Sequence, residues 1–153
     1  GILDGTKNPQ LVDLLLQLGE LASREGKHHA ALQRYERALE LQRETLGEEH
    51  PQLALTLTLI GLVWLALDEP EKAISPLERA LELRNGRTID PLELARTRFA
   101  LARARWEAPS AQERERALAR ELAERALEAY VAGGERAASE REEVETWLAG
   151  HAG

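Results

Sequence analysis

A five-residue string recurs three times in this chain of 153 residues, and it constrains the fold more than any other feature. Glu-Arg-Ala-Leu-Glu occupies residues 36–40, 78–82 and 124–128, so the first two copies lie 42 residues apart and the last two lie 46 apart. Spacing of this kind is typical of repeat architectures, in which each repeat is one supersecondary unit that stacks on the next. We therefore predict a solenoid rather than a globular single-core fold.

The residues around the first two copies recur at the same interval, and Gly19 and Gly61 are the most informative of them. Glycine inside a helix costs about 1 kcal/mol relative to alanine, so its recurrence needs a packing reason. We expect each glycine to lie at a close crossing of two helices, because small residues let the backbones approach. The expected partners across the crossing are Ala31 and Ala38 for Gly19, and Ala73 and Ala80 for Gly61.

Capping and breaking residues divide the chain into seven expected helices. Proline favours the first helical turn, a short polar residue favours the position before it, and glycine favours the end. Asn8-Pro9 and Asp90-Pro91 are start signals of this kind, and Ser110 with Glu113 has the spacing of a capping box. The expected helices cover about 9–25, 28–46, 51–68, 70–84, 91–107, 110–133 and 135–149.

Both copies resemble the tetratricopeptide repeat. Leu15, Leu18, Gly19, Ala22, Ala31, Tyr35 and Ala38 in the first copy stand where Leu57, Ile60, Gly61, Trp64, Ala73, Leu77 and Ala80 stand in the second. The resemblance implies an all-α, right-handed superhelix of about three helix pairs with a C-terminal capping helix. Its expected units are repeat 1 at about 9–47, repeat 2 at 51–86, a degenerate repeat 3 at 90–133 and a cap at 135–149. The 42-residue period resembles the long repeats of kinesin light chains and many bacterial signalling proteins.

The third copy departs from the pattern, because Arg103 stands where the glycine is expected. We therefore expect a wider, atypical helix pair there. The segments 94–106, 117–130 and 141–148 also resemble the C-terminal tails of large bacterial serine/threonine kinases with tetratricopeptide regions. The chain contains no methionine and opens at Gly1, so we interpret it as a piece of a longer protein.

Composition excludes several classes of function. The net charge is −7, from 27 acidic and 20 basic residues, so binding to a phosphate backbone is disfavoured. The absence of cysteine excludes a zinc–thiolate site and fits the reducing cytoplasm, which we predict as the location. No apolar run has the form of a membrane span. No phosphate-binding loop, metal motif or nucleophile constellation occurs, so we predict no enzyme activity, no metal and no cofactor.

The resemblance implies that the first helix of each pair lines a concave face, where another protein or peptide binds. The third helix is apolar on all sides, which leaves two alternatives open. Either neighbouring helices or repeats outside the chain cover it, or it forms a groove for an apolar segment or for a second copy. The candidate residues are Asp13, Leu16, Gln17, Glu20, Leu55, Thr58, Leu59, Leu62 and Leu65.

The function predicted from this face is that of a protein-binding scaffold. Asp13 and Glu20 with Gln17 form an expected acidic rim that favours a basic partner. The Lys/Asn/Arg set with which some tetratricopeptide domains grip a terminal carboxylate is absent, so chaperone-tail binding is not predicted. The alternative is a rigid spacer, or a module that pairs with itself to form a homodimer, within a larger bacterial signalling protein.

Overall fold

The fold was analysed in a computed structural model that describes residues 9–84 and 90–152. Within these ranges the chain forms seven α-helices and one short 3₁₀ turn, and no strand. The fold class is therefore all-α, as the sequence predicts. The elements are α1 (Pro9–Arg24), α2 (His28–Leu46), α3 (Leu53–Ala66), α4 (Pro70–Arg84), α5 (Pro91–Glu107), α6 (Glu113–Ala132), η2 (Gly134–Ala137) and α7 (Ala138–Gly150).

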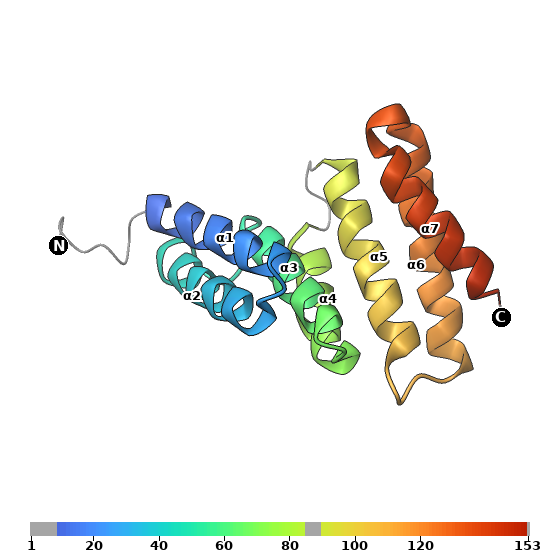
Figure 1. The fold of residues 1–153 in the computed structure, drawn as a ribbon, viewed down its shortest axis with the longest axis horizontal. Helices are drawn as coiled ribbons and strands as arrows, with labels where there is room; N and C mark the ends of the chain where they lie inside the picture. Colours follow the sequence, from blue (N-terminus) through green and yellow to red (C-terminus); the bar gives the residue numbers. More distant parts are fainter. Residues whose placement is uncertain (1–8, 85–89, 153) are drawn as a thin grey trace.

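Consecutive helices pack as pairs that stack along the long axis of the molecule (Figure 1). α1 packs on α2, α3 on α4 and α5 on α6, while α2 contacts α3 and α4 contacts α5 to join one pair to the next. α7 folds back on α6 and closes the C-terminal end. Each pair thus contacts only its neighbours along the chain, which is the arrangement expected of a solenoid.

The observed helix ends lie close to the capping and helix-breaking residues of the sequence, with small differences. α2, α4 and α5 begin and end where they were predicted. α3 begins at Leu53 rather than Pro51, because the ring Nδ1 of His50 accepts a hydrogen bond from the backbone N–H of Gln52 at 3.1 Å and holds a turn before the helix. Asn8, the expected cap of α1, lies outside the described residues.

The start of α6 corrects the sequence-based prediction. Ser110 does not cap this helix, because its hydroxyl instead donates to the Glu71 carboxylate of α4 at 3.3 Å. The capping box lies two residues later in the chain, at Gln112 and Glu115. In it, the Glu115 carboxylate accepts a hydrogen bond from the backbone N–H of Gln112 at 3.2 Å. The last helix is also displaced, since η2 occupies 134–137 and α7 begins only at Ala138.

The close crossings occur at the two predicted glycines, but their partners are large side chains. A Cβ on Gly19 would lie 2.4 Å from Cε1 of Tyr35, and a Cβ on Gly61 would lie 2.5 Å from Cγ of Leu77. These large partners, Tyr35 and Leu77, were not among the expected ones. The alanines at 31, 38, 73 and 80 are fully buried on either side of Tyr35 and Leu77, so each large side chain inserts between small ones against a bare backbone.

The third pair packs closely although Arg103 replaces the glycine. α5 and α6 make the most extensive contact of any pair, so the expected wide crossing is not observed. The physical reason is that alanine lines both helices at the interface, and alanine also allows close approach. The buried alanines are Ala95 and Ala102 of α5, and Ala119, Ala123 and Ala126 of α6.

The C-terminal cap is held by aromatic rings. Trp147 of α7 meets Phe99 edge-on with ring centroids 5.8 Å apart, and meets Trp106 edge-on at 5.7 Å. The ring of His151 stacks on Trp147 at 4.2 Å. Trp147 therefore anchors the last helix on the stack, and His151 is a further member of this aromatic cluster.

Replacing Gly61 by alanine is expected to destabilise the fold by about 1–3 kcal/mol, because the added Cβ overlaps Leu77 in a tightly packed crossing. This sign is opposite to that of helix propensity, which favours alanine. Urea unfolding followed by circular dichroism measures the change. Gly150→Ala is the matched control, because nothing lies within 4 Å of its added Cβ. Equal stability of the two variants would show that the crossing is not close.

Folding stability is expected to fall as the pH rises from 10 towards 12. Burial raises the pKa of the phenols of Tyr35 and Tyr130 from 10.0 to about 12, so the unfolded chain loses these protons first. The contribution of both groups is complete below pH 10 and is lost through pH 12. Urea midpoints at pH 9 and pH 11.5 test this against the double variant Tyr35→Phe, Tyr130→Phe, whose loss should be smaller. These are the only two tyrosines, so phenolate absorbance reports them directly.

Candidate functional site

The first helices of the three pairs together form one side of a groove of about 670 Å³. We call it the α1–α3–α5 groove. Its walls combine apolar side chains with carboxylates, and the second helices contribute their C-terminal ends. The lining residues are Pro9, Val12, Asp13 and Leu16 of α1, Gln42, Thr45 and Leu46 of α2, Pro51, Gln52 and Leu55 around the start of α3, Arg84 of α4, and Asp90 and Glu93 around the start of α5.

The charges in this groove are predominantly negative. Among the described residues, Asp13, Asp90 and Glu93 line it together with one cation, the guanidinium of Arg84. Asp90 is partly engaged as the cap of α5, since its carboxylate accepts the backbone N–H of Leu92 at 2.9 Å. Glu93 has a buried Oε2 without a hydrogen-bond partner, which lies 3.9 Å from Nη2 of Arg84.

Arg84 is the buried centre of a polar chain that connects the groove with the interior. Its Nη1 donates to the hydroxyl of Thr97 at 3.2 Å, and that hydroxyl lies 2.8 Å from the hydroxyl of Thr58 in α3. Burial lowers the pKa of the Arg84 guanidinium, and the Glu93 carboxylate opposes this effect. The arrangement satisfies polar groups at the junction of α3, α4 and α5, and it fixes the position of Glu93 relative to α3.

The structure separates the nine predicted site residues into three sets. Asp13, Leu16 and Leu55 line the α1–α3–α5 groove. Glu20, Leu59 and Leu62 line a second hollow of about 420 Å³ on the same face, together with Ser23, Arg24, Tyr35, Val63 and Arg96. Gln17 is exposed and lines neither, while Thr58 and Leu65 are buried in the interior.

The burial of α3 corrects the expectation that its outer row is available to a partner. Thr58 is fully buried because it hydrogen-bonds to Thr97 of α5, and Leu65 packs with Leu101 of α5. Leu59 is 3% exposed and reaches only the floor of the second hollow. For these residues the first alternative holds, since neighbouring helices of the same chain cover the face. Leu55 and Leu62 remain partly exposed.

The prediction that Asp13, Gln17 and Glu20 form one acidic rim is also corrected. Asp13 lies in the α1–α3–α5 groove, whereas Glu20 lies in the second hollow beside Arg24 and Arg96. A carboxylate flanked by two guanidinium groups does not extend an acidic surface. In the groove Asp13 is joined by Asp90 and Glu93, which the sequence analysis did not select.

Some residues of the groove could have been predicted from the helical spacing of the sequence, and others could not. Val12 lies one helical turn before Leu16, so the i, i+4 spacing places it on the same side of α1. Arg84 and Glu93 end one helix and begin the next, and their meeting depends on the path between α4 and α5. No periodicity in the sequence specifies that path.

Other kinds of site find no support in the described ranges. Among residues 9–84 and 90–152 no group of three or more His, Asp or Glu side chains is placed to hold a metal ion. Of the helices that the structure describes, none is both long enough and apolar enough to span a bilayer.

Comparison with known proteins agrees with this architecture. A tetratricopeptide repeat family model matches residues 10–86, about half of the chain. Among solved structures, the NMR structure of the first TPR domain of the human RPAP3 protein is similar over 94% of this chain and 97% of that chain, with a TM-score of 0.63 and 18% sequence identity. At that identity the likeness concerns the fold alone. The comparison with curated proteins found no match.

The resemblance that was based on Gly19 and Gly61 is thus confirmed at the level of the repeat, while the long-repeat variety and the kinase tail stay predictions. The family match covers the first two helix pairs, and the described residues form the stack of helix pairs that such repeats build. The chain belongs to the tetratricopeptide repeat family.

Proposed function

We propose that this chain is a scaffold that holds another protein, and that it seats an apolar, basic segment of that partner in the α1–α3–α5 groove. Tetratricopeptide folds commonly mediate protein–protein interaction, which supports the general class. The observation that carries the specific proposal is the composition of the groove. Its volume of about 670 Å³ accommodates several side chains, and its walls are apolar at Val12, Leu16 and Leu55.

The charges of the groove favour a basic partner segment over an acidic one. Among the described residues, three carboxylates and one guanidinium line the groove. A lysine or arginine side chain can offset the excess negative charge of these groups, while leucine-like side chains next to it contact the apolar walls. A partner segment rich in glutamate would bring like charges together, which is unfavourable in a partly desolvated site.

Asp13 offers a test that leaves the fold intact, because this side chain is exposed. Two fluorescein-labelled amphipathic peptides of equal length serve as probes, one built from leucine and lysine and the other from leucine and glutamate. The lysine peptide is expected to bind more tightly to the native chain. Asp13→Lys is expected to weaken that binding by about five- to tenfold, as measured by fluorescence anisotropy at low salt.

Glu36→Lys is the matched control for this experiment. Glu36 is exposed on α2 outside the groove, so the substitution changes the net charge equally without altering the site. Its effect on lysine-peptide binding is expected to stay within about twofold. Equal weakening by both variants would mean that only overall charge attracts the peptide. Tighter binding of the glutamate peptide to the native chain would contradict the proposed partner chemistry.

A further inference from the structure

The second hollow differs from the α1–α3–α5 groove in its charge, although both lie on the same face. Arg24 and Arg96 line this hollow of about 420 Å³, and Glu20 is the only carboxylate among the described residues that line it. Neither guanidinium forms an ion pair or a hydrogen bond with a described residue. The hollow therefore carries a net positive charge, whereas carboxylates predominate in the groove.

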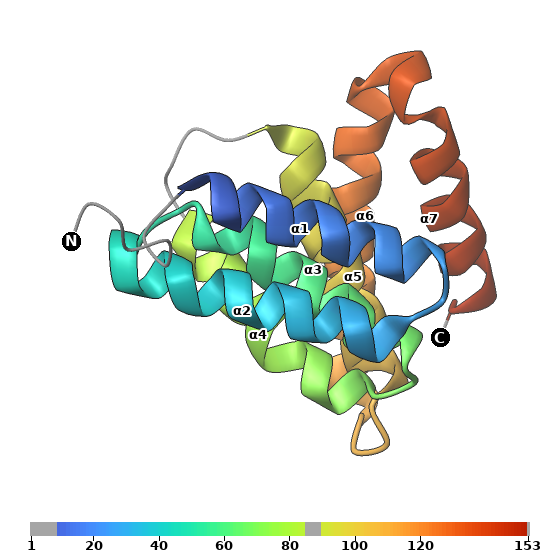
Figure 2. The ribbon, with the colours of Figure 1, turned by 60° about the vertical axis from the view of Figure 1, so that its left-hand side comes forward.

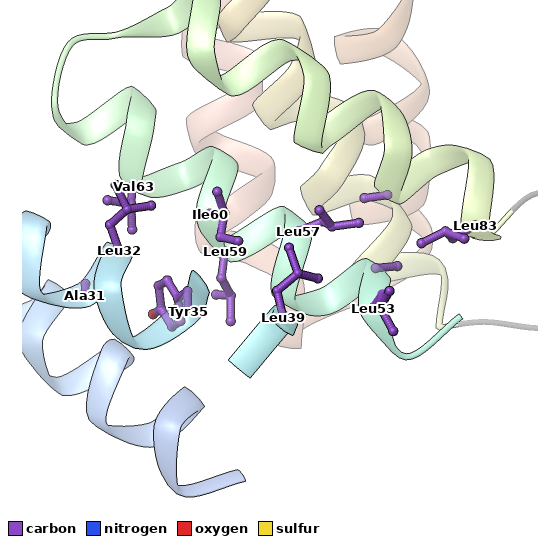
Figure 3. Packing of buried hydrophobic residues seen from close by; sticks show 12 residues of the cluster. Ala31, Leu32, Tyr35, Leu39, Leu53, Leu57, Leu59, Ile60, Val63 and Leu83 are labelled. Carbon is purple, nitrogen blue, oxygen red and sulfur yellow. The ribbon is translucent and has the colours of Figure 1, made fainter. Parts of the chain in front are cut away.

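A buried tyrosine also lines this hollow. Tyr35 of α2 is 2% exposed, and its ring lies in the buried cluster that contains Leu59 and Val63 of α3 (Figure 3). Within residues 9–84 and 90–152 its hydroxyl forms no hydrogen bond. A buried hydroxyl without a partner is unfavourable, so a ligand that accepts a hydrogen bond at this point gains affinity.

The charges that act on the Tyr35 phenol place it beside both guanidinium groups. Burial and the Glu20 carboxylate raise the pKa of this phenol, while Arg96 and Arg24 act in the opposite direction. The phenol stays protonated at neutral pH and is therefore a hydrogen-bond donor. One hydroxyl donor and two planar guanidinium groups close together suit the two oxygens of a carboxylate.

The groove and the second hollow follow each other along the same three helices. Figure 2 shows α1, α3 and α5 one behind another in the stack. On each of these helices the residues that line the groove precede those that line the hollow. Leu55 and Leu62 of α3 are both partly exposed, and their i, i+7 spacing puts them on one side of the helix. Two helical turns, or about 10 Å, therefore separate the two sites.

We propose that the second hollow binds the side-chain carboxylate of an acidic residue in the same partner segment whose basic residue lies in the α1–α3–α5 groove. Arg24, Arg96 and Tyr35 recognise this carboxylate. The inference rests on the proposed function, because it places both residues on one segment. That segment is a helix with leucine-like residues toward Leu55 and Leu62, a lysine or arginine at one end, and a glutamate or aspartate two turns away.

A neighbouring hollow of about 490 Å³ does not offer the same preference for a carboxylate. It shares Leu62 and Arg96 with the second hollow, but the charges among its described lining residues balance. An acidic side chain there meets as many carboxylates as guanidinium groups, so it gains less than in the second hollow. These groups are Glu93, Glu140 and Glu143, with Arg96, Arg103 and Arg136.

Two fluorescein-labelled helical peptides of equal length test the proposal by fluorescence anisotropy at low salt. The lysine peptide carries lysine at both ends of its polar face, and in the lysine–glutamate peptide glutamate replaces the lysines of one end. Arg96→Glu is expected to weaken binding of the lysine–glutamate peptide by about five- to tenfold, because its carboxylates lose a cation and meet a like charge. Binding of the lysine peptide should stay equal or become tighter.

Arg34→Glu is the matched control for this substitution. Arg34 is exposed on α2 and lines neither the groove nor the second hollow, so the net charge changes equally away from both sites. The ratio of the two dissociation constants is expected to stay within about twofold of the native ratio. Circular dichroism of both variants checks that the helices are retained.

Tyr35→Phe tests the hydroxyl without disturbing the crossing, because the phenyl ring keeps its contact with Gly19. The expected result is a loss of about two- to fivefold in affinity for the lysine–glutamate peptide, since one hydrogen bond to the carboxylate is removed. Affinity for the lysine peptide should not change. Equal affinities of native chain and variant for the lysine–glutamate peptide would remove Tyr35 from the proposed site.

The outcomes separate this proposal from the proposed function. If Arg96→Glu changes the ratio of dissociation constants no more than Arg34→Glu does, the second hollow is not a carboxylate site, and lysine-peptide binding that depends on Asp13 leaves the groove intact. Loss of the lysine–glutamate peptide in Arg96→Glu but not in Asp13→Lys supports the carboxylate site and contradicts the groove. A native chain that binds neither peptide overturns both.

Discussion

The close crossing of two helices at a bare glycine backbone is the contact on which the first two pairs depend. Tyr35 and Leu77 occupy space that a methyl group on Gly19 or Gly61 would fill. The distance between the two helices of a pair follows from this contact, and it sets where the flanking leucines project. Because each pair rests on the one before it, the geometry of one crossing carries into the next interface.

α3 illustrates how the stack resolves an apparent conflict in the sequence. The helix is apolar all round, yet it contains Thr56 and Thr58 in fully buried positions. Both hydroxyls are satisfied by side chains of adjacent helices, Gln42 of α2 and Thr97 of α5. These hydrogen bonds cross from one repeat to the next, so the polar groups specify which helices meet while the leucines supply the burial.

The sequence predicted those features that arise from local rules. Glycine, proline and the 42-residue period located most helix ends, and the fold class followed from the repeat. The sequence predicted fewer of the features that depend on packing between helices distant in the chain. Thr58 looked available because one helix viewed alone shows no neighbour, whereas α5 covers it in the stack. Arg84 and Glu93 meet across a connection whose path no propensity specifies, and of the four charged residues described as lining the groove only Asp13 was selected from the sequence.

The aromatic cap on α7 makes the described part of the stack unequal in its resistance to local opening. In a chain of nearest-neighbour contacts, a terminal unit is held by one interface, and its opening free energy is that of this interface. The aromatic contacts of Trp147 add to the interface at the C-terminal side. Among the described residues α1 and α2 have no equivalent addition, so the aromatic contacts make the C-terminal interface the more resistant of the two to local opening.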